Sequence, residues 1–218
     1  MSRRSPAAEL SLPRGAEPDP ELEALPEPRR PGRRLTLVAM ALTTLAALAM
    51  ALTLRADARY SLESGPPAEV DDLTHLQPVP SLANRWVHGV ALLGTRGAIR
   101  YGRPLDGDTF RLAPVAGNNH IWVEVRVPEG MEGPRFVPPT SFVGRLIPFS
   151  SAGLRHQDLP DAVANAGGTH VPAGAWLLID GESPSSTRWS LGLIALFIGF
   201  AAFNLWGLYK LIRPVRDG

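Results

Sequence analysis

The chain contains no cysteine among its 218 residues. Disulfide bonds, thiolate metal sites and thiol catalysis are therefore excluded. A folded region of roughly 130 residues is large enough to bury a sufficient core without disulfides. Its stability must then come from apolar packing and hydrogen bonding.

Lysine is almost absent as well, because Lys210 is the only one. The remaining basic residues are arginines, and with 21 acidic residues the formal net charge is +1. A chain this close to neutral gives no electrostatic reason to bind nucleic acid. Abundant Arg, Ala, Pro and Gly are typical of a GC-rich bacterial genome.

The motifs of common enzyme classes are also missing. The sequence has no GxSxG, HExxH, P-loop or GxGxxG pattern. The five histidines are too far apart for a chelate on one helix or hairpin; they are His75, His88, His120, His156 and His170. We therefore predict no catalytic residue, metal site or cofactor, and the sequence identifies no residues that would bind one.

Two long runs without charge stand out against this background. Residues 35–54 supply twenty apolar or small residues, which as a helix extend about 30 Å, the thickness of a bilayer core. A buried core helix would carry a polar face, and a cleaved signal peptide would have a shorter leader and apolar run. We interpret the run as an uncleaved signal anchor. Residues 189–212 form a second span, with Trp189, Trp206 and Tyr209 where interfacial aromatic residues are expected.

The charges beside the spans predict their orientation. Arginines crowd the chain before the first span, and Lys210, Arg213 and Arg216 follow the second. The positive-inside rule then places both termini in the cytoplasm. We expect a bacterial inner-membrane protein whose central region faces the periplasm.

Outside the spans the composition divides the chain further. Residues 1–34 are rich in Pro, Glu and Arg and predict a disordered cytoplasmic tail, and residues 213–218 a short one. Residues 55–80 predict a linker, because prolines interrupt them. Residues 81–188 predict the periplasmic β domain, with strands and one short helix; the strands are 86–93, 98–101, 109–115, 121–127, 142–149 and 175–179, and the helix is 159–166.

The predicted fold class is an all-β outer domain, a small antiparallel barrel or sandwich of six or seven strands, flanked by two transmembrane α-helices. Residues 121–127 alternate most strictly and predict a half-buried strand. Its inward face comprises Ile121, Val123, Val125 and Val127. Trp122, Glu124 and Arg126 are expected on the other face.

One proline-rich segment is a candidate for partner contact. A rigid proline pair that presents aromatic and arginine side chains suits a protein interface. The candidate residues are Arg135, Phe136, Pro138, Pro139, Phe142 and Arg145. The alternative is that the segment only covers the core.

The layout resembles the Surfeit-locus family of cytochrome oxidase assembly factors, which have a span at each end of an outer β-rich domain. Val87-His88-Gly89, the strand 121–127 and Phe142-Val143-Gly144-Arg145-Leu146 follow the family's order. Its Gly-x-Trp-Gln and Arg-Gly-Trp motifs have no counterpart here.

The resemblance implies a function in assembling a membrane complex, of respiratory type. From the residues we predict a non-enzymatic domain whose partners are the bilayer and another membrane protein. The alternative is a membrane-anchored envelope enzyme that uses dispersed His, Asp and Arg residues.

Overall fold

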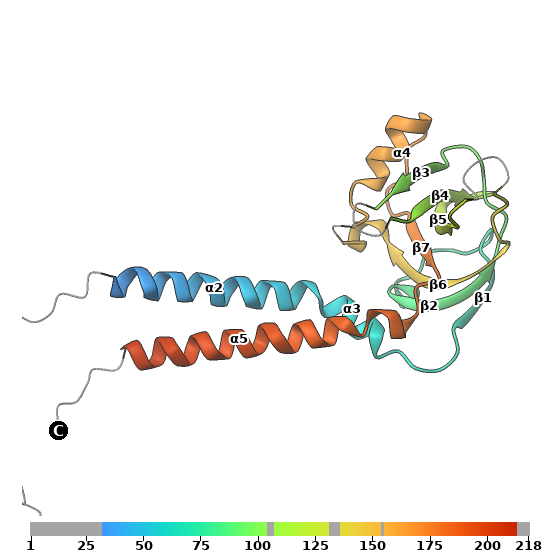
Figure 1. Cartoon of the computed structure of the whole chain (residues 1–218). Coiled ribbons are helices and arrows are strands. Elements are labelled where there is room, and N and C mark those ends of the chain that lie inside the picture. The colour runs from blue at the N-terminus through green and yellow to red at the C-terminus, as the bar shows by residue number, and fades with distance from the viewer. Residues whose placement is uncertain (1–31, 104–106, 131–135, 154, 213–218) are drawn as a thin grey trace, which may run out of the picture.

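The computed structural model describes residues 32–103, 107–130, 136–153 and 155–212. Two long helices run side by side, and a folded β-sheet domain sits at one end of them (Figure 1). Of the expected cytoplasmic tails, residues 1–31 and 213–218 lie outside the described residues.

The long helices are α2 (Arg33–Thr53) and α5 (Trp189–Ile212). Both are long and apolar enough to cross a membrane, with mean hydropathies of 2.2 and 2.0 over their most apolar windows. Only 11% of each window is buried within the protein. A soluble core helix would be mostly buried, so this exposure argues against that alternative and agrees with a lipid environment.

The two helices pack antiparallel as a hairpin. Thr44 and Ala47 are the buried residues of α2, and Ala201 and Asn204 are their counterparts in the middle of α5. The Arg33 guanidinium donates to the Leu211 carbonyl at the open end. Ala47 therefore lies at the helix interface, whereas the small residues Ala195 and Gly199 of α5 are exposed.

This packing is testable with introduced cysteines, since no native cysteine competes. We expect Thr44→Cys paired with Ala201→Cys to form an intramolecular crosslink, because both side chains are buried in the seam between the helices. Thr44→Cys paired with Ala202→Cys is the matched control, because Ala202 is exposed on another face. The gel mobility of the oxidised protein measures the crosslinking of each pair. Equal crosslinking of the two pairs would contradict this helix packing.

Between the helices the chain folds into one seven-stranded mixed sheet, ordered β1-β2-β6-β7-β5-β4-β3. The strands are β1 (Ala68–Asp72), β2 (Arg85–Val90), β3 (Ile99–Gly102), β4 (Thr109–Val115), β5 (Asn118–Val127), β6 (Ser141–Pro148) and β7 (Trp176–Asp180). Short helices complete the domain: α3 (Arg55–Ser61), α4 (Leu159–Gly167), and the 3-10 turns η1 (Pro80–Leu82), η2 (Phe149–Ser151) and η3 (Pro184–Thr187).

The all-β barrel or sandwich prediction is wrong in two respects. The sheet is open, with β1 and β3 at its edges, and two of its pairings, β1 with β2 and β5 with β7, are parallel. The parallel pairings arise because residues 55–80 contribute α3 and β1, and because the connection through α4 inserts β7 between β5 and β6. Antiparallel pairing joins β4 to β5 across the turn at Gly117.

Gly144 lies in the middle of β6, where its pairing with β2 and β7 is regular. The backbone of β7 instead approaches closely, since an added Cβ would lie 1.9 Å from the Ile179 carbonyl oxygen. Only glycine fits this contact, so Gly144 allows β6 and β7 to meet.

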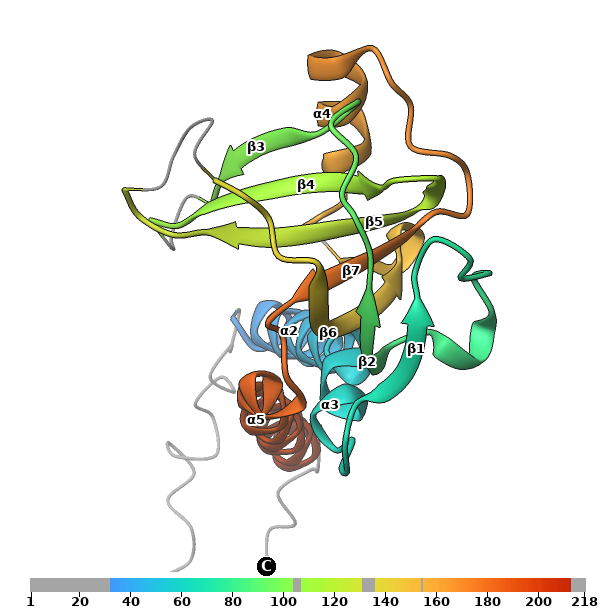
Figure 2. The same cartoon turned by 90° about the vertical axis from the view of Figure 1, so that its right-hand side faces the viewer.

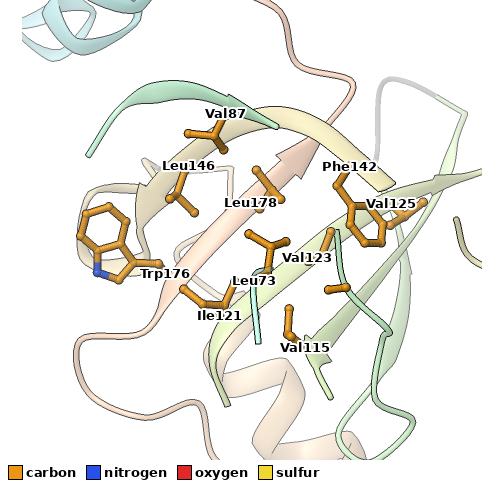
Figure 3. Close-up of a cluster of buried hydrophobic side chains, with 11 residues drawn as sticks. Leu73, Val87, Val115, Ile121, Val123, Val125, Phe142, Leu146, Trp176 and Leu178 are labelled. Carbon is orange, nitrogen blue, oxygen red and sulfur yellow. The ribbon is translucent and has the colours of Figure 1, made fainter. Parts of the chain in front are cut away.

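Both faces of the central strands are covered, and each has its own apolar cluster. One cluster gathers Val87, Val123, Phe142 and Leu178 from four strands (Figure 3). The other contains Trp122 and Leu177 and packs under α4 through Val163. Figure 2 shows α4 beside β3, at the end of the sheet opposite to the end where the long helices lie.

The half-buried prediction for residues 121–127 is therefore wrong. Ile121, Val123 and Val125 are buried as expected, but so are Trp122 and Glu124, which are 0% and 1% exposed. The alternating pattern identified the strand and its core face correctly. It failed on the second face because α4 and a buried ion-pair cluster cover it, and only Arg126 is exposed as predicted.

Candidate functional site

A cavity of about 700 Å³ lies where the sheet domain meets the two long helices. Thr53, the last residue of α2, and Trp189, the first of α5, both line it. Its opposite wall comes from β5, β6 and the end of β7. Arg155 and Trp189 are exposed on its lining, so the cavity is open to solvent.

One wall of the cavity is organised around Arg145, whose side chain is only 8% exposed. Its guanidinium donates to Asp57 of α3 at 2.7 Å, to Glu182 at 3.1 Å and to Asn84 at 2.7 Å. The guanidinium also lies 4.7 Å from the centre of the Tyr60 ring. These partners tie the extension of α2, the centre of β6 and the segment leading to α5 into one unit.

Tyr60 strengthens the same junction. Its hydroxyl donates to the Glu182 carbonyl at 2.6 Å. Burial first, and then the nearby Glu182 carboxylate, raises the pKa of Tyr60 well above its ordinary value. The phenol therefore stays protonated and continues to donate across the working pH range.

The cavity is also lined by a second ionic cluster, of Arg103, Glu124 and His156. Arg103 follows β3, Glu124 belongs to β5 and His156 precedes α4. The Arg103 guanidinium donates to Glu124 Oε1, and His156 Nε2 lies 2.8 Å from Glu124 Oε2. Glu124 and His156 are both buried, and Arg103 also stacks 3.9 Å from the centre of the Phe110 ring.

The environment keeps Glu124 ionised. Burial alone would raise its pKa, but the hydrogen bond and charge of His156, with smaller contributions from Tyr101 and Arg103, lower the pKa below its ordinary value. The same arrangement raises the pKa of Tyr101, because burial and the adjacent Glu124 carboxylate both oppose phenolate formation. The cluster is thus a carboxylate held by a guanidinium and an imidazole, with a neutral phenol beside it.

This geometry leaves His156 poorly placed for catalysis. Its Nδ1 lies 3.1 Å from the Ala152 carbonyl oxygen, which requires a proton on Nδ1. Its Nε2 is already between Glu124 and Arg103, at 2.8 and 3.2 Å. A general base needs one ring nitrogen free to reach substrate, and both are occupied. Within the described residues, no group of three His, Asp or Glu is arranged to hold a metal ion.

The structure separates the six residues predicted to contact a partner. Arg135 lies outside the described residues. Phe142 is fully buried and Phe136 packs partly buried against the same core cluster, while Arg145 is held in its buried ion pairs. Pro138 is half-buried and Pro139 is exposed.

Between the two anchoring phenylalanines the segment does expose apolar surface. Val137 is 83% exposed; Val90, the last residue of β2, and Leu92, just after that strand, are 46% and 67% exposed. A hydrogen bond of 2.9 Å from the Ala91 N–H to the Thr140 carbonyl holds the two segments together. We call Val90, Leu92, Val137 and Pro139 the apolar patch.

Sequence reasoning missed both ionic clusters. The strand pattern predicts an outward-facing Glu124, and Asp57, one acidic partner of Arg145, falls within the predicted linker. The one available signal was the presence of Glu124 within an apolar strand, because a carboxylate on a buried strand needs a charged partner.

The comparisons with known proteins add no family assignment. No protein-family profile matches the chain, and neither the curated proteins nor the solved structures give a significant match.

Proposed function

We propose that this chain is a membrane-anchored, non-catalytic binding module whose outer domain contacts another integral membrane protein through the apolar patch. The main support for this proposal is the exposure of Val137, Leu92 and Val90. These apolar side chains belong to the outer domain and not to the spans. Exposed apolar groups that lie together are a common feature of protein interfaces.

The anchoring supports a partner in the same membrane. Two spans hold the domain at the bilayer surface, and the Arg145 cluster fixes its attachment to both. Neither residues 35–54 nor residues 190–209 contain an Asp, Glu, Lys, Arg or His, one of which a transporter would need within its spans. Assembly of a membrane complex, as the Surfeit-like layout implies, suits this arrangement.

An envelope enzyme is the second candidate, favoured by the convergence of Arg103, Glu124 and His156 on one cavity. The two candidates differ in what His156→Gln does. An enzyme would lose its function although the protein still folds. A binding module would retain partner binding as long as the domain stays folded.

The proposed orientation makes a direct prediction. Both termini are cytoplasmic and the sheet domain is periplasmic, because the arginine-rich flanks lie outside the two spans. Alkaline phosphatase fused after His120 should be active in bacterial cells, whereas the same enzyme fused after Gly218 should be inactive. The reverse pattern would refute this orientation.

The patch is tested by substitution and co-purification. We expect Val137→Asp and Leu92→Asp to reduce recovery of an integral membrane partner from mild detergent at least about tenfold, since a charge in an interface core costs well over 1.4 kcal/mol. Quantitative mass spectrometry of the co-purified proteins provides the measurement.

Val79→Asp is the matched control, since Val79 is 41% exposed but lies outside the patch. Both patch residues are exposed, so the unfolding transition should be unchanged within about 0.5 kcal/mol. Equal partner recovery with all three variants would refute the patch as the interface.

A further inference from the structure

We propose that the cavity between the sheet and the long helices binds the head group of a bilayer lipid that carries both a phosphate and a primary ammonium group. This inference rests on the proposed membrane orientation but not on the apolar patch. It concerns a different surface and a different class of ligand.

The location of the cavity points to a lipid. Its lining runs from Thr53, at the end of α2, to Trp189, at the start of α5. Tryptophan at the end of a span marks the level of the lipid head groups, and Trp189 is 55% exposed. A volume of about 700 Å³ lies in the range of small-ligand sites.

The charges of the lining point to the chemistry of the head group. Most of them are neutralised within the protein, as in the clusters of Arg145 and Glu124, and Arg126 pairs with Asp108 at 2.7 Å. Two remain without an ion-pair partner among the described residues. They are the exposed guanidinium of Arg155 and the half-buried carboxyl of Asp180.

Asp180 is held in place without being neutralised. Its Oδ1 accepts a hydrogen bond from the Val143 N–H at 3.1 Å. Burial raises the pKa of Asp180, although the N–H groups of Val143 and Gly181 act in the opposite direction. A bound ammonium group would supply the missing countercharge, as a phosphate would for Arg155.

The full-length protein in nanodiscs provides the test. The discs contain equal parts of phosphatidylethanolamine, phosphatidylcholine and phosphatidylglycerol, and native mass spectrometry of the released protein counts the retained lipids. We expect retention of phosphatidylethanolamine over both others. The quaternary ammonium of choline has no N–H to donate to Asp180, and the glycerol head group has no cation.

Substitutions assign the preference to the two side chains. Arg155→Gln and Asp180→Asn should each reduce the preference for phosphatidylethanolamine about tenfold, which is the effect expected from the loss of one charge-assisted contact. Arg96→Gln and Asp161→Asn, at exposed positions outside the cavity, should leave it unchanged. Equal retention of the three lipids, a preference for phosphatidylglycerol, or indifference to both cavity substitutions would overturn the proposal.

A competition experiment distinguishes a bound lipid from a soluble ligand with the same head-group chemistry. Free glycerophosphoethanolamine at millimolar concentration should fail to displace the retained lipid, because it lacks acyl chains in the bilayer. Efficient displacement would overturn the assignment to a lipid. Absence of lipid selectivity in the unsubstituted protein, with partner recovery that still depends on the apolar patch, would disprove this inference alone.

Discussion

Arg145→Ala is expected to destabilise the outer domain by about 3–5 kcal/mol, the usual cost of removing one partner from a buried ion pair. The substitution leaves Asp57 and Glu182 close together without their shared cation, and their side chains are only 30% and 20% exposed. Chemical unfolding in detergent measures the loss, followed through the fluorescence of the buried Trp122 and Trp176.

Arg126→Ala is the matched control. Arg126 also pairs with an aspartate at 2.7 Å, but its side chain is 66% exposed. Exposed ion pairs contribute at most about 1 kcal/mol, so this variant should unfold close to the parent protein. Equal destabilisation by the two substitutions would contradict the assignment of Arg145 as the junction between sheet and hairpin.

Glu124→Ala is the second substitution with a large expected effect, again about 3–5 kcal/mol. The carboxylate is 1% exposed and contacts both Arg103 and His156. Without it the Arg103 guanidinium, 13% exposed, loses its contact with the Glu124 carboxylate. The same unfolding titration measures the effect.

A combined variant distinguishes the ion pair from simple packing. Arg103→Met with Glu124→Leu removes both charges and retains apolar volume, so it should recover most of the lost stability. Additive losses in the double variant would show that the two residues stabilise the fold independently.

The lowered pKa of Glu124 also predicts a dependence on pH. Because its folded pKa lies below the unfolded value, its contribution is fully present above the unfolded pKa. The contribution is lost as the pH falls through the folded pKa. Stability of the parent protein should therefore drop in acid more steeply than that of Glu124→Gln.

The spans and most strands could be predicted because each depends on local pattern. Uncharged runs of twenty residues identify the long helices, and alternation identifies β5. The edge strand β1 was missed because Ala68–Asp72 is mostly acidic, with only Val70 typical of a strand. Its pairing with β2 is decided by tertiary packing.

The ionic clusters could not be predicted for a related reason. Arg103, Glu124 and His156 are separated by 21 and then 32 positions, and only the sheet order brings them together. Alternation within β5 says which residues share a face. It does not say that α4 and the hairpin junction cover the second face.

The most direct test of the proposed function is site-specific photocrosslinking in the membrane of the cells that produce the protein. A photoreactive amino acid replaces Leu92 or Val137 in the apolar patch, and Val79 in a control. The account predicts one integral membrane protein crosslinked from both patch positions and absent from the control. Crosslinks of equal yield from all three positions, or none from the patch, would contradict it.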